Sequence, residues 1–244
     1  MKSQTGSHQI SQPTGAPPRP AAAPPAIPDG RVRVVIESVT PSVPGGSFHI
    51  KRTVGESVTV EADIFADGHD KIVAVVRHRR CDSQEWLEVR MEPLANDRWR
   101  AAFPVLSEGE FEFTVEAWID HFGTWQRDLR RRAEASQDLR AEYLIGAAFI
   151  EHAIRDGSPE HVDLKRYADL FRRESTPDRI RIALDERVSM LMARCDRRAF
   201  AARMETPTRI WVDHKRARFS SWYELFPRSF GGFGGVARVL PACA

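Results

Sequence analysis

The sequence predicts an α+β protein in which a helical bundle is inserted into an immunoglobulin-like antiparallel β-sandwich. Three observations predict this fold. Between residues 31 and 122, apolar and polar residues alternate in short runs that Gly, Asp, Asn and Pro separate. Between residues 129 and 204, apolar residues recur at the spacing of amphipathic helices. After Pro207 the strand pattern returns in the run TRIWVD, so we expect the helices to lie between two strands of one sheet.

The first 30 residues differ in composition from the rest of the chain. They are rich in Pro, Ala, Ser and Gln and lack apolar periodicity, so we expect residues 1–30 to be a disordered tail. Over the 244 residues, 36 basic and 34 acidic side chains nearly balance, which leaves no overall field to attract nucleic acid or a membrane. The spacing of Cys81, Cys195 and Cys243 fits neither a disulfide framework nor a zinc site, and indicates a cytoplasmic protein.

The strands are predicted from alternation, because every second side chain of a strand points to the same face. The first run, RVRVVI, places Val32, Val34 and Ile36 on one face. In three later runs the alternation assigns the following residues to the core: Val58, Val60, Ala62 and Ile64; Leu87, Val89 and Met91; and Phe111, Phe113, Val115, Ala117 and Ile119.

The helical bundle is predicted from three apolar stripes. We expect Gly157 to end the first helix, and Ser158-Pro159 and Thr176-Pro177 to start the next two as an N-cap followed by proline. The stripes are Leu139, Tyr143, Ala147, Ile150 and Ile154; Leu164, Tyr167, Ala168 and Phe171; and Ile180, Leu184, Val188, Leu191 and Cys195.

Two tryptophans are the candidate binding residues. Alternation turns Trp86 and Trp118 away from the core, where the two indoles could stack on a glycan or be covered by the helical insertion, another domain or a second subunit. Covering is favoured, because a large exposed aromatic side chain promotes association. No catalytic residue, metal ligand or cofactor is assigned, since the chain has no HExxH, GxSxG or phosphate-loop pattern.

The strongest basic cluster is RDLRRR, from Arg127 to Arg132. Such a cluster beside Trp125 could contact nucleic acid. However, the run opens a predicted helix in which Glu134, Asp138 and Glu142 follow, so ion pairs within a solvated helix face are the favoured interpretation. We therefore expect no nucleic-acid partner and, without an apolar run of roughly 18 residues, no membrane partner.

Four motifs carry a resemblance to a known family: GHD at residues 68–70, EFTVEAW at 112–118, TWQRDL at 124–129 and WYELFPRS at 222–229. Around them, from about Gly30 to Pro241, the sequence resembles the N-terminal region of the alpha-1,4-glucan:maltose-1-phosphate maltosyltransferases, bacterial enzymes of the alpha-amylase superfamily (glycoside hydrolase family 13). The resemblance implies a β-sandwich with a helical insertion that contributes to a homodimer. It also implies a parent enzyme that moves maltosyl units from maltose 1-phosphate to the non-reducing end of alpha-1,4-glucans.

The resemblance further implies that WYELFPRS opens a (β/α)8 catalytic barrel. A barrel needs about 250 residues, and in the family the nucleophilic aspartate, the acid/base glutamate and the phosphate contacts lie in it. We therefore expect a chain truncated at the start of the barrel and inactive alone, with maltose 1-phosphate and alpha-1,4-glucan as ligands of the full-length enzyme only. The alternative is a stand-alone glycan-binding or protein-interaction module.

The predicted division of the chain follows from these patterns. Residues 31–128 together with 205–214 form the sandwich, and residues 129–204 form the helical insertion. Residues 215–244 are the start of the barrel. The aromatic side chains of this last segment, which a barrel would bury, are expected to be exposed and to promote association.

Overall fold

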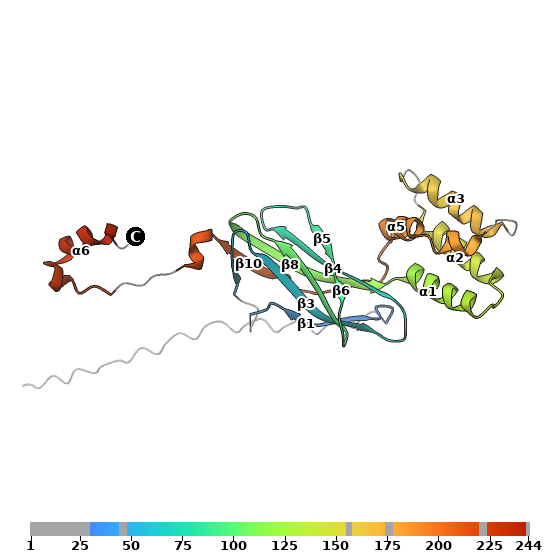
Figure 1. Ribbon diagram of the computed structural model, residues 1–244, viewed down its shortest axis with the longest axis horizontal. Coiled ribbons are helices and arrows are strands. Elements are labelled where there is room, and N and C mark those ends of the chain that lie inside the picture. Colours follow the sequence, from blue (N-terminus) through green and yellow to red (C-terminus); the bar gives the residue numbers. More distant parts are fainter. Residues whose placement is uncertain (1–29, 44–47, 155–157, 174–177, 220–223, 243–244) are drawn as a thin grey trace, which may run out of the picture. The chain divides into compact units, whose positions relative to one another are not determined.

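Two β-sheets and a group of helices make up the fold (Figure 1). The computed structural model describes residues 30–43, 48–154, 158–173, 178–219 and 224–242. The predicted tail lies outside the described residues apart from Gly30, and so do Gly157 and the Thr176-Pro177 start signal.

The strands form one sheet of four and one of six. The first has the order β1-β3-β7-β6, and the second has the order β2-β10-β8-β4-β5 with the short β9 also paired to β8. The strands are β1 (Val34–Thr40), β2 (Ile50–Thr53), β3 (Ser57–Ala66), β4 (Ile72–Arg80), β5 (Leu87–Arg90), β6 (Glu92–Pro93), β7 (Arg98–Pro104), β8 (Gly109–Ile119), β9 (Ala202–Arg203) and β10 (Thr208–Asp213). We call these strands the sheet region.

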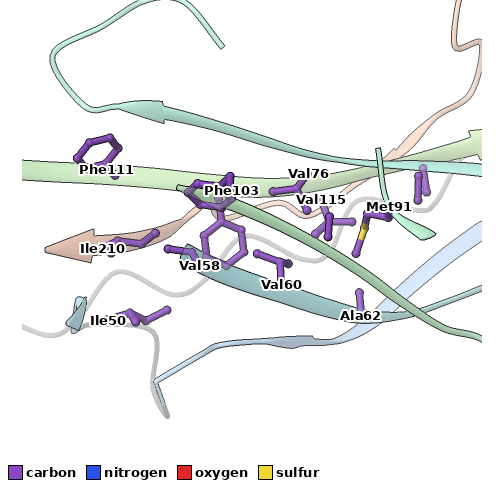
Figure 2. Packing of buried hydrophobic residues seen from close by; sticks show 14 of the residues in the cluster. Ile50, Val58, Val60, Ala62, Val76, Met91, Phe103, Phe111, Val115 and Ile210 are labelled. Carbon is purple, nitrogen blue, oxygen red and sulfur yellow. The ribbon is translucent and has the colours of Figure 1, made fainter. Parts of the chain in front are cut away.

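One hydrophobic core lies between the two sheets. Figure 2 shows Val58 and Val60 of β3 facing Val76 of β4 and Val115 of β8, with Phe103 beside them. The alternation predicted this face of β3 and β8 correctly. In β3, the alternate residues Val58, Val60, Ala62 and Ile64 are at most 1% exposed. Filling one core with side chains from both sheets is what fixes the register of each strand.

Leu87 is the clear error of the alternation argument. It was expected in the core, yet it is 55% exposed. β5 is the edge strand of its sheet, and Leu87 is the first residue of β5, opposite His78 of β4. The His78 ring stacks on Phe103 with 4.1 Å between the ring centroids, so the core is already filled beside Leu87.

β10 confirms that residues 208–213 return to the sheet. Ile210 lies opposite Phe111 of β8 in an antiparallel pair, and Ile210 is fully buried. On its other side, however, β10 runs parallel to β2, with Ile210 opposite Ile50. The expectation of a purely antiparallel sandwich is wrong for this pair. No hairpin joins the two strands, because most of the chain separates them, so no turn fixes their relative direction.

The helical region lies in the chain between β8 and β9. It comprises α1 (His121–Glu134), α2 (Arg140–Ala153), α3 (His161–Arg172), α4 (Arg179–Ala183) and α5 (Glu186–Cys195). The three predicted stripes are confirmed, because every residue in them is buried in, or packed against, one core that the helices share. This core contains Phe122, Trp125 and Leu129 of α1 as well, since α1 begins before residue 129.

The ends of the helices differ from those expected. Ser158-Pro159 does not cap α3, which begins at His161 without a side-chain cap. The third stripe is divided between α4 and α5, because the Asp185 carboxylate accepts a hydrogen bond from the backbone N–H of Arg187 and starts a new helix.

The C-terminal segment contains short helical elements. These are the 3-10 helices η1 (Lys215–Arg218), η2 (Pro227–Phe230) and η3 (Leu240–Ala242), and the helix α6 (Phe233–Val239), which follows a turn at Gly231 and Gly232 with φ of 74° and 94°. Residue 219 and residues 224–226 are not in a strand, and residues 220–223 lie outside the described part. Phe219 and Phe233 are 83% and 82% exposed. In the described part of the chain, no helix has the length and apolar character needed to cross a bilayer.

Candidate functional site

Trp118 lies on the outer face of the six-stranded sheet, near the end of β8. It packs with Val73 and Val75 of β4 and is only 4% exposed. The residues that cover it come from the segment that follows α5. The indole Nε1 donates a hydrogen bond to Asp196 Oδ2 at 2.5 Å, and the Arg198 guanidinium carbon lies 4.4 Å from the ring centroid. This segment therefore covers most of the indole.

The shape of this covering segment is set locally. The Asp196 carboxylate also accepts a hydrogen bond from the backbone N–H of Arg198 at 2.9 Å. Arg198 and Phe200 have φ of 49° and 56°, a left-handed conformation that is uncommon for such residues and turns the chain sharply. β9 then pairs with β8, with Ala202 opposite Ala117, which holds the segment against the sheet.

An ionic network surrounds the covered indole. Arg198 donates to both carboxylate oxygens of Glu88 at 2.8 and 2.6 Å, and Arg203 donates to Glu116 Oε1 at 2.8 Å. Arg77 lies within 3.2 Å of Glu88 Oε1 and 3.5 Å of Glu116 Oε2. The hydrogen bonds from Arg198 lower the pKa of Glu88. Charged groups in this arrangement connect β4, β5 and β8 to the segment after α5.

Trp86 lies against two other arginines, one of which, Arg77, belongs to this network. It is half-buried, and the guanidinium carbons of Arg77 and Arg79 lie 5.3 and 4.5 Å from its ring centroid. Arg79 is in turn held by Glu112 at 2.6 Å. The two predicted candidate residues therefore contact different sets of side chains, and the structure does not join Trp86 and Trp118 into one stacking platform.

A cavity of about 600 Å³ lies between the six-stranded sheet and the helical region. Its aromatic and apolar lining includes Trp118, Phe122, Phe149 and Met192, and its polar lining includes His121, His152, Lys71, Arg90, Arg197, Asp120 and Asp196. Sequence reasoning missed this cavity. The lining comes from β4, β5, β8, α1, α2, α5 and the segment after α5, and no local spacing relates these residues.

The two cavity carboxylates are already used within the protein. Asp120 caps α1 by accepting a hydrogen bond from the backbone N–H of Gly123 at 2.7 Å, and Asp196 accepts from Trp118 and Arg198. Among the residues that the structure describes, no three His, Cys, Asp or Glu side chains come together as a set of metal ligands. The cavity thus offers binding groups and no free carboxylate.

The basic cluster from Arg127 to Arg132 lies inside α1 and does not open it. Trp125 is 5% exposed, and its Nε1 donates to the backbone carbonyl of Glu142, so it is not placed to stack on a base. Arg132 pairs with Glu142 of α2 at 3.3 Å. The ion pair therefore joins two helices, whereas the sequence argument expected pairs within one helix.

The comparisons with known proteins agree with the family resemblance. The family model for domain N/S of alpha-1,4-glucan:maltose-1-phosphate maltosyltransferase matches residues 32–214. An enzyme of that name from Chlorobaculum tepidum is 39% identical over 224 residues, which covers 88% of this chain and 33% of the relative. The corresponding enzyme from Myxococcus xanthus is 40% identical over 205 residues, covering 80% of this chain and 31% of the relative.

The length of these relatives limits what their names say about this chain. A third relative, from Methylacidiphilum infernorum, is 35% identical over 217 residues, which covers 88% of this chain and 32% of the relative. The chain thus spans about a third of the length of the curated relatives it matches. Because the domain model covers the sheet region and the helical region together, the chain belongs to the alpha-1,4-glucan:maltose-1-phosphate maltosyltransferase family through its domain N/S.

Proposed function

We propose that this chain is the N-terminal accessory region of a cytoplasmic enzyme that moves maltosyl units from maltose 1-phosphate to the non-reducing end of alpha-1,4-glucans. The observation that carries the proposal is the match of residues 32–214 to domain N/S. Cys81 is a free cysteine, which fits a reducing compartment.

The proposal includes the finer architecture. We assign the two sheets to an immunoglobulin-like β-sandwich. Its strands lie between residues 34 and 119 and between residues 202 and 213, and the helices between residues 121 and 195 are its insertion. We assign residues 215–244 to the opening of a (β/α)8 barrel of glycoside hydrolase family 13. The exposure of Phe219, Phe226 and Phe233 supports this, because a following domain would bury such side chains.

The role proposed for this region is structural. A retaining glycosyl transfer needs two carboxyl groups about 5 Å apart across the reacting bond. In the cavity, the described carboxylates of Asp120 and Asp196 are both occupied by hydrogen bonds within the protein. The region would therefore support catalysis by another part of the enzyme without taking part in the chemistry.

Homodimer formation is the second part of the role. Apolar side chains stand exposed on the helical region: Leu144 and Ile145 of α2 are 50% and 45% exposed, and Met190 of α5 is 50% exposed. Apolar surface of this kind favours a protein partner. The double variant Leu144→Ser/Ile145→Ser should shift the sedimentation profile toward monomer, whereas Leu106→Ser, outside the helices and 73% exposed, should not. An unchanged profile in the double variant would show that this surface does not form the dimer.

The catalytic part of the proposal is tested by phosphate release. The purified chain, incubated with maltose 1-phosphate and glycogen, should release no phosphate above a heat-inactivated control. A full-length relative, such as the Myxococcus xanthus enzyme, serves as the positive control. Turnover by the purified chain would show that it contains its own catalytic groups, and the accessory role would be wrong.

The alternative, a glycan-binding module, depends on Trp86 and Trp118. Trp86 is the more accessible of the two, because it is half-buried while Trp118 is 4% exposed. Retention on a glycogen affinity gel distinguishes the two functions. Loss of retention in Trp86→Ala, with unchanged melting temperature, would favour the glycan-binding module over the accessory region.

A further inference from the structure

The lining of the cavity between the sheet region and the helical region is positively charged. Among the residues that line it, Lys71, Arg90, Arg197 and Arg198 are cationic, and only Asp120 and Asp196 are anionic. Arg198 is neutralised by its bidentate pair with Glu88. The other three cations have no such partner: over the described part of the chain, no ion pair or side-chain hydrogen bond reaches the Lys71 ammonium or the Arg90 and Arg197 guanidinium groups.

These unpaired cations stand out because most arginines of the sheet region are paired. Arg77, Arg79, Arg80, Arg98, Arg100, Arg203 and Arg209 each have a carboxylate within 3.5 Å. Arg90 is an exception that faces the cavity. It comes from β5, Lys71 precedes β4 and Arg197 follows α5, so three separate segments bring positive charge to one place.

The rest of the lining is suited to a ring. Trp118, Phe122, Phe149 and Met192 give the cavity an apolar wall, next to the cationic groups. His121 and His152 add ring nitrogens that can donate or accept hydrogen bonds. A volume of about 600 Å³ lies within the range of small-molecule sites.

We propose that this cavity binds a small phosphate monoester whose ring lies against the apolar wall and whose phosphate is held by Arg90, Arg197 and Lys71. A phosphate monoester carries close to two negative charges at neutral pH. An arginine fork matches the phosphate oxygens in a bidentate manner, and lysine adds a point charge. A phosphorylated sugar and a nucleoside monophosphate share this chemistry, and the experiment separates them.

The test is calorimetric titration of the whole chain at low salt with four probes: maltose 1-phosphate, adenosine monophosphate, inorganic phosphate and maltose. We expect one of the two phosphate monoesters to bind at least tenfold more tightly than inorganic phosphate or maltose. The monoester that binds more tightly shows whether the cavity takes a phosphorylated sugar or a nucleoside monophosphate. If neither binds more tightly than inorganic phosphate, the proposal is overturned.

Variants locate the binding. The double variant Arg90→Ala/Arg197→Ala should weaken the monoester at least tenfold, while Arg130→Ala/Arg131→Ala, which removes two exposed arginines of α1 outside the cavity, should stay within twofold. In Ala193→Phe a ring would enter the cavity and block the ligand with little change in melting temperature. Equal affinity in the wild type and all three variants would place the ligand elsewhere and overturn the proposal. No maltosyl transfer is measured, so the result is independent of the proposed function.

Discussion

Asp196→Ala should destabilise the fold through the covered indole of Trp118. The variant removes the acceptor 2.5 Å from Trp118 Nε1 and leaves this N–H without a partner on a side chain that is 4% exposed. An unsatisfied buried donor costs about 1–3 kcal/mol, and the lost bond to the Arg198 backbone N–H adds about 0.5 kcal/mol. The total of about 1.5–3.5 kcal/mol lowers the melting temperature by roughly 3–14 °C in a protein of this size.

Thermal denaturation followed by near-ultraviolet circular dichroism measures this change. Asp196→Asn keeps one acceptor oxygen and should lose no more than about half as much stability. Asp169→Ala, which removes an exposed carboxylate of α3, is the matched control and should stay within about 0.5 kcal/mol of the wild type. If Asp196→Ala melts like Asp169→Ala, the hydrogen bond does not hold the segment against the sheet.

Three further changes test other parts of the structure. In Gly146→Ala the new Cβ would lie 2.2 Å from the Trp125 ring, so the melting temperature of this variant should fall by several degrees. The control Gly234→Ala, whose Cβ meets nothing within 4 Å, should melt as the wild type does. Equal melting temperatures in the two variants would show that α1 and α2 adjust freely. Because Arg198 holds the pKa of Glu88 below 4.5, this carboxylate stabilises the fold above that pH and loses its contribution as the pH falls through its lowered pKa. Glu88→Gln should therefore be less stable than the wild type at pH 7 and lose less stability on acidification in urea denaturation; parallel pH profiles would refute this. Deleting residues 219–244 removes Phe219 and Phe233, which are 83% and 82% exposed, and should raise the soluble yield, whereas an unchanged or lower yield would show that the segment stabilises the rest.

Alternation predicted the strands well, because it is visible in a short stretch of sequence and arises from the burial of one face of each strand in the core. Phe113 and Val115 of β8 are fully buried, as their spacing required. It failed at Leu87, since a two-residue period says which face a side chain takes and not where the sheet ends. Alternation also could not predict that β2 and β10 run parallel, because no turn connects these strands.

The candidate site was predictable only in part. Alternation turned Trp118 away from the core, which is correct, but the acceptor on Asp196 lies 78 residues further along the chain. Lys71, Arg90 and Arg197 read as isolated surface cations in the sequence. Only the packing of the helices against the sheet brings them to one cavity, and no spacing rule relates residues that come from three different segments.

The pairing of β9 with β8 bears on the order in which the chain folds. Residues 120–201 connect the antiparallel strands β8 and β9, as a turn does in a hairpin, since Ala202 lies opposite Ala117. Closing an open loop of about 80 residues costs about 2–3 kcal/mol more than closing a four-residue turn. The core of the helical region draws only on residues 122–195, so we expect it to form before β9 pairs with β8 and to shorten the loop beforehand. β10 would then be the last strand to enter, filling the gap between β2 and β8 once the helices are in place.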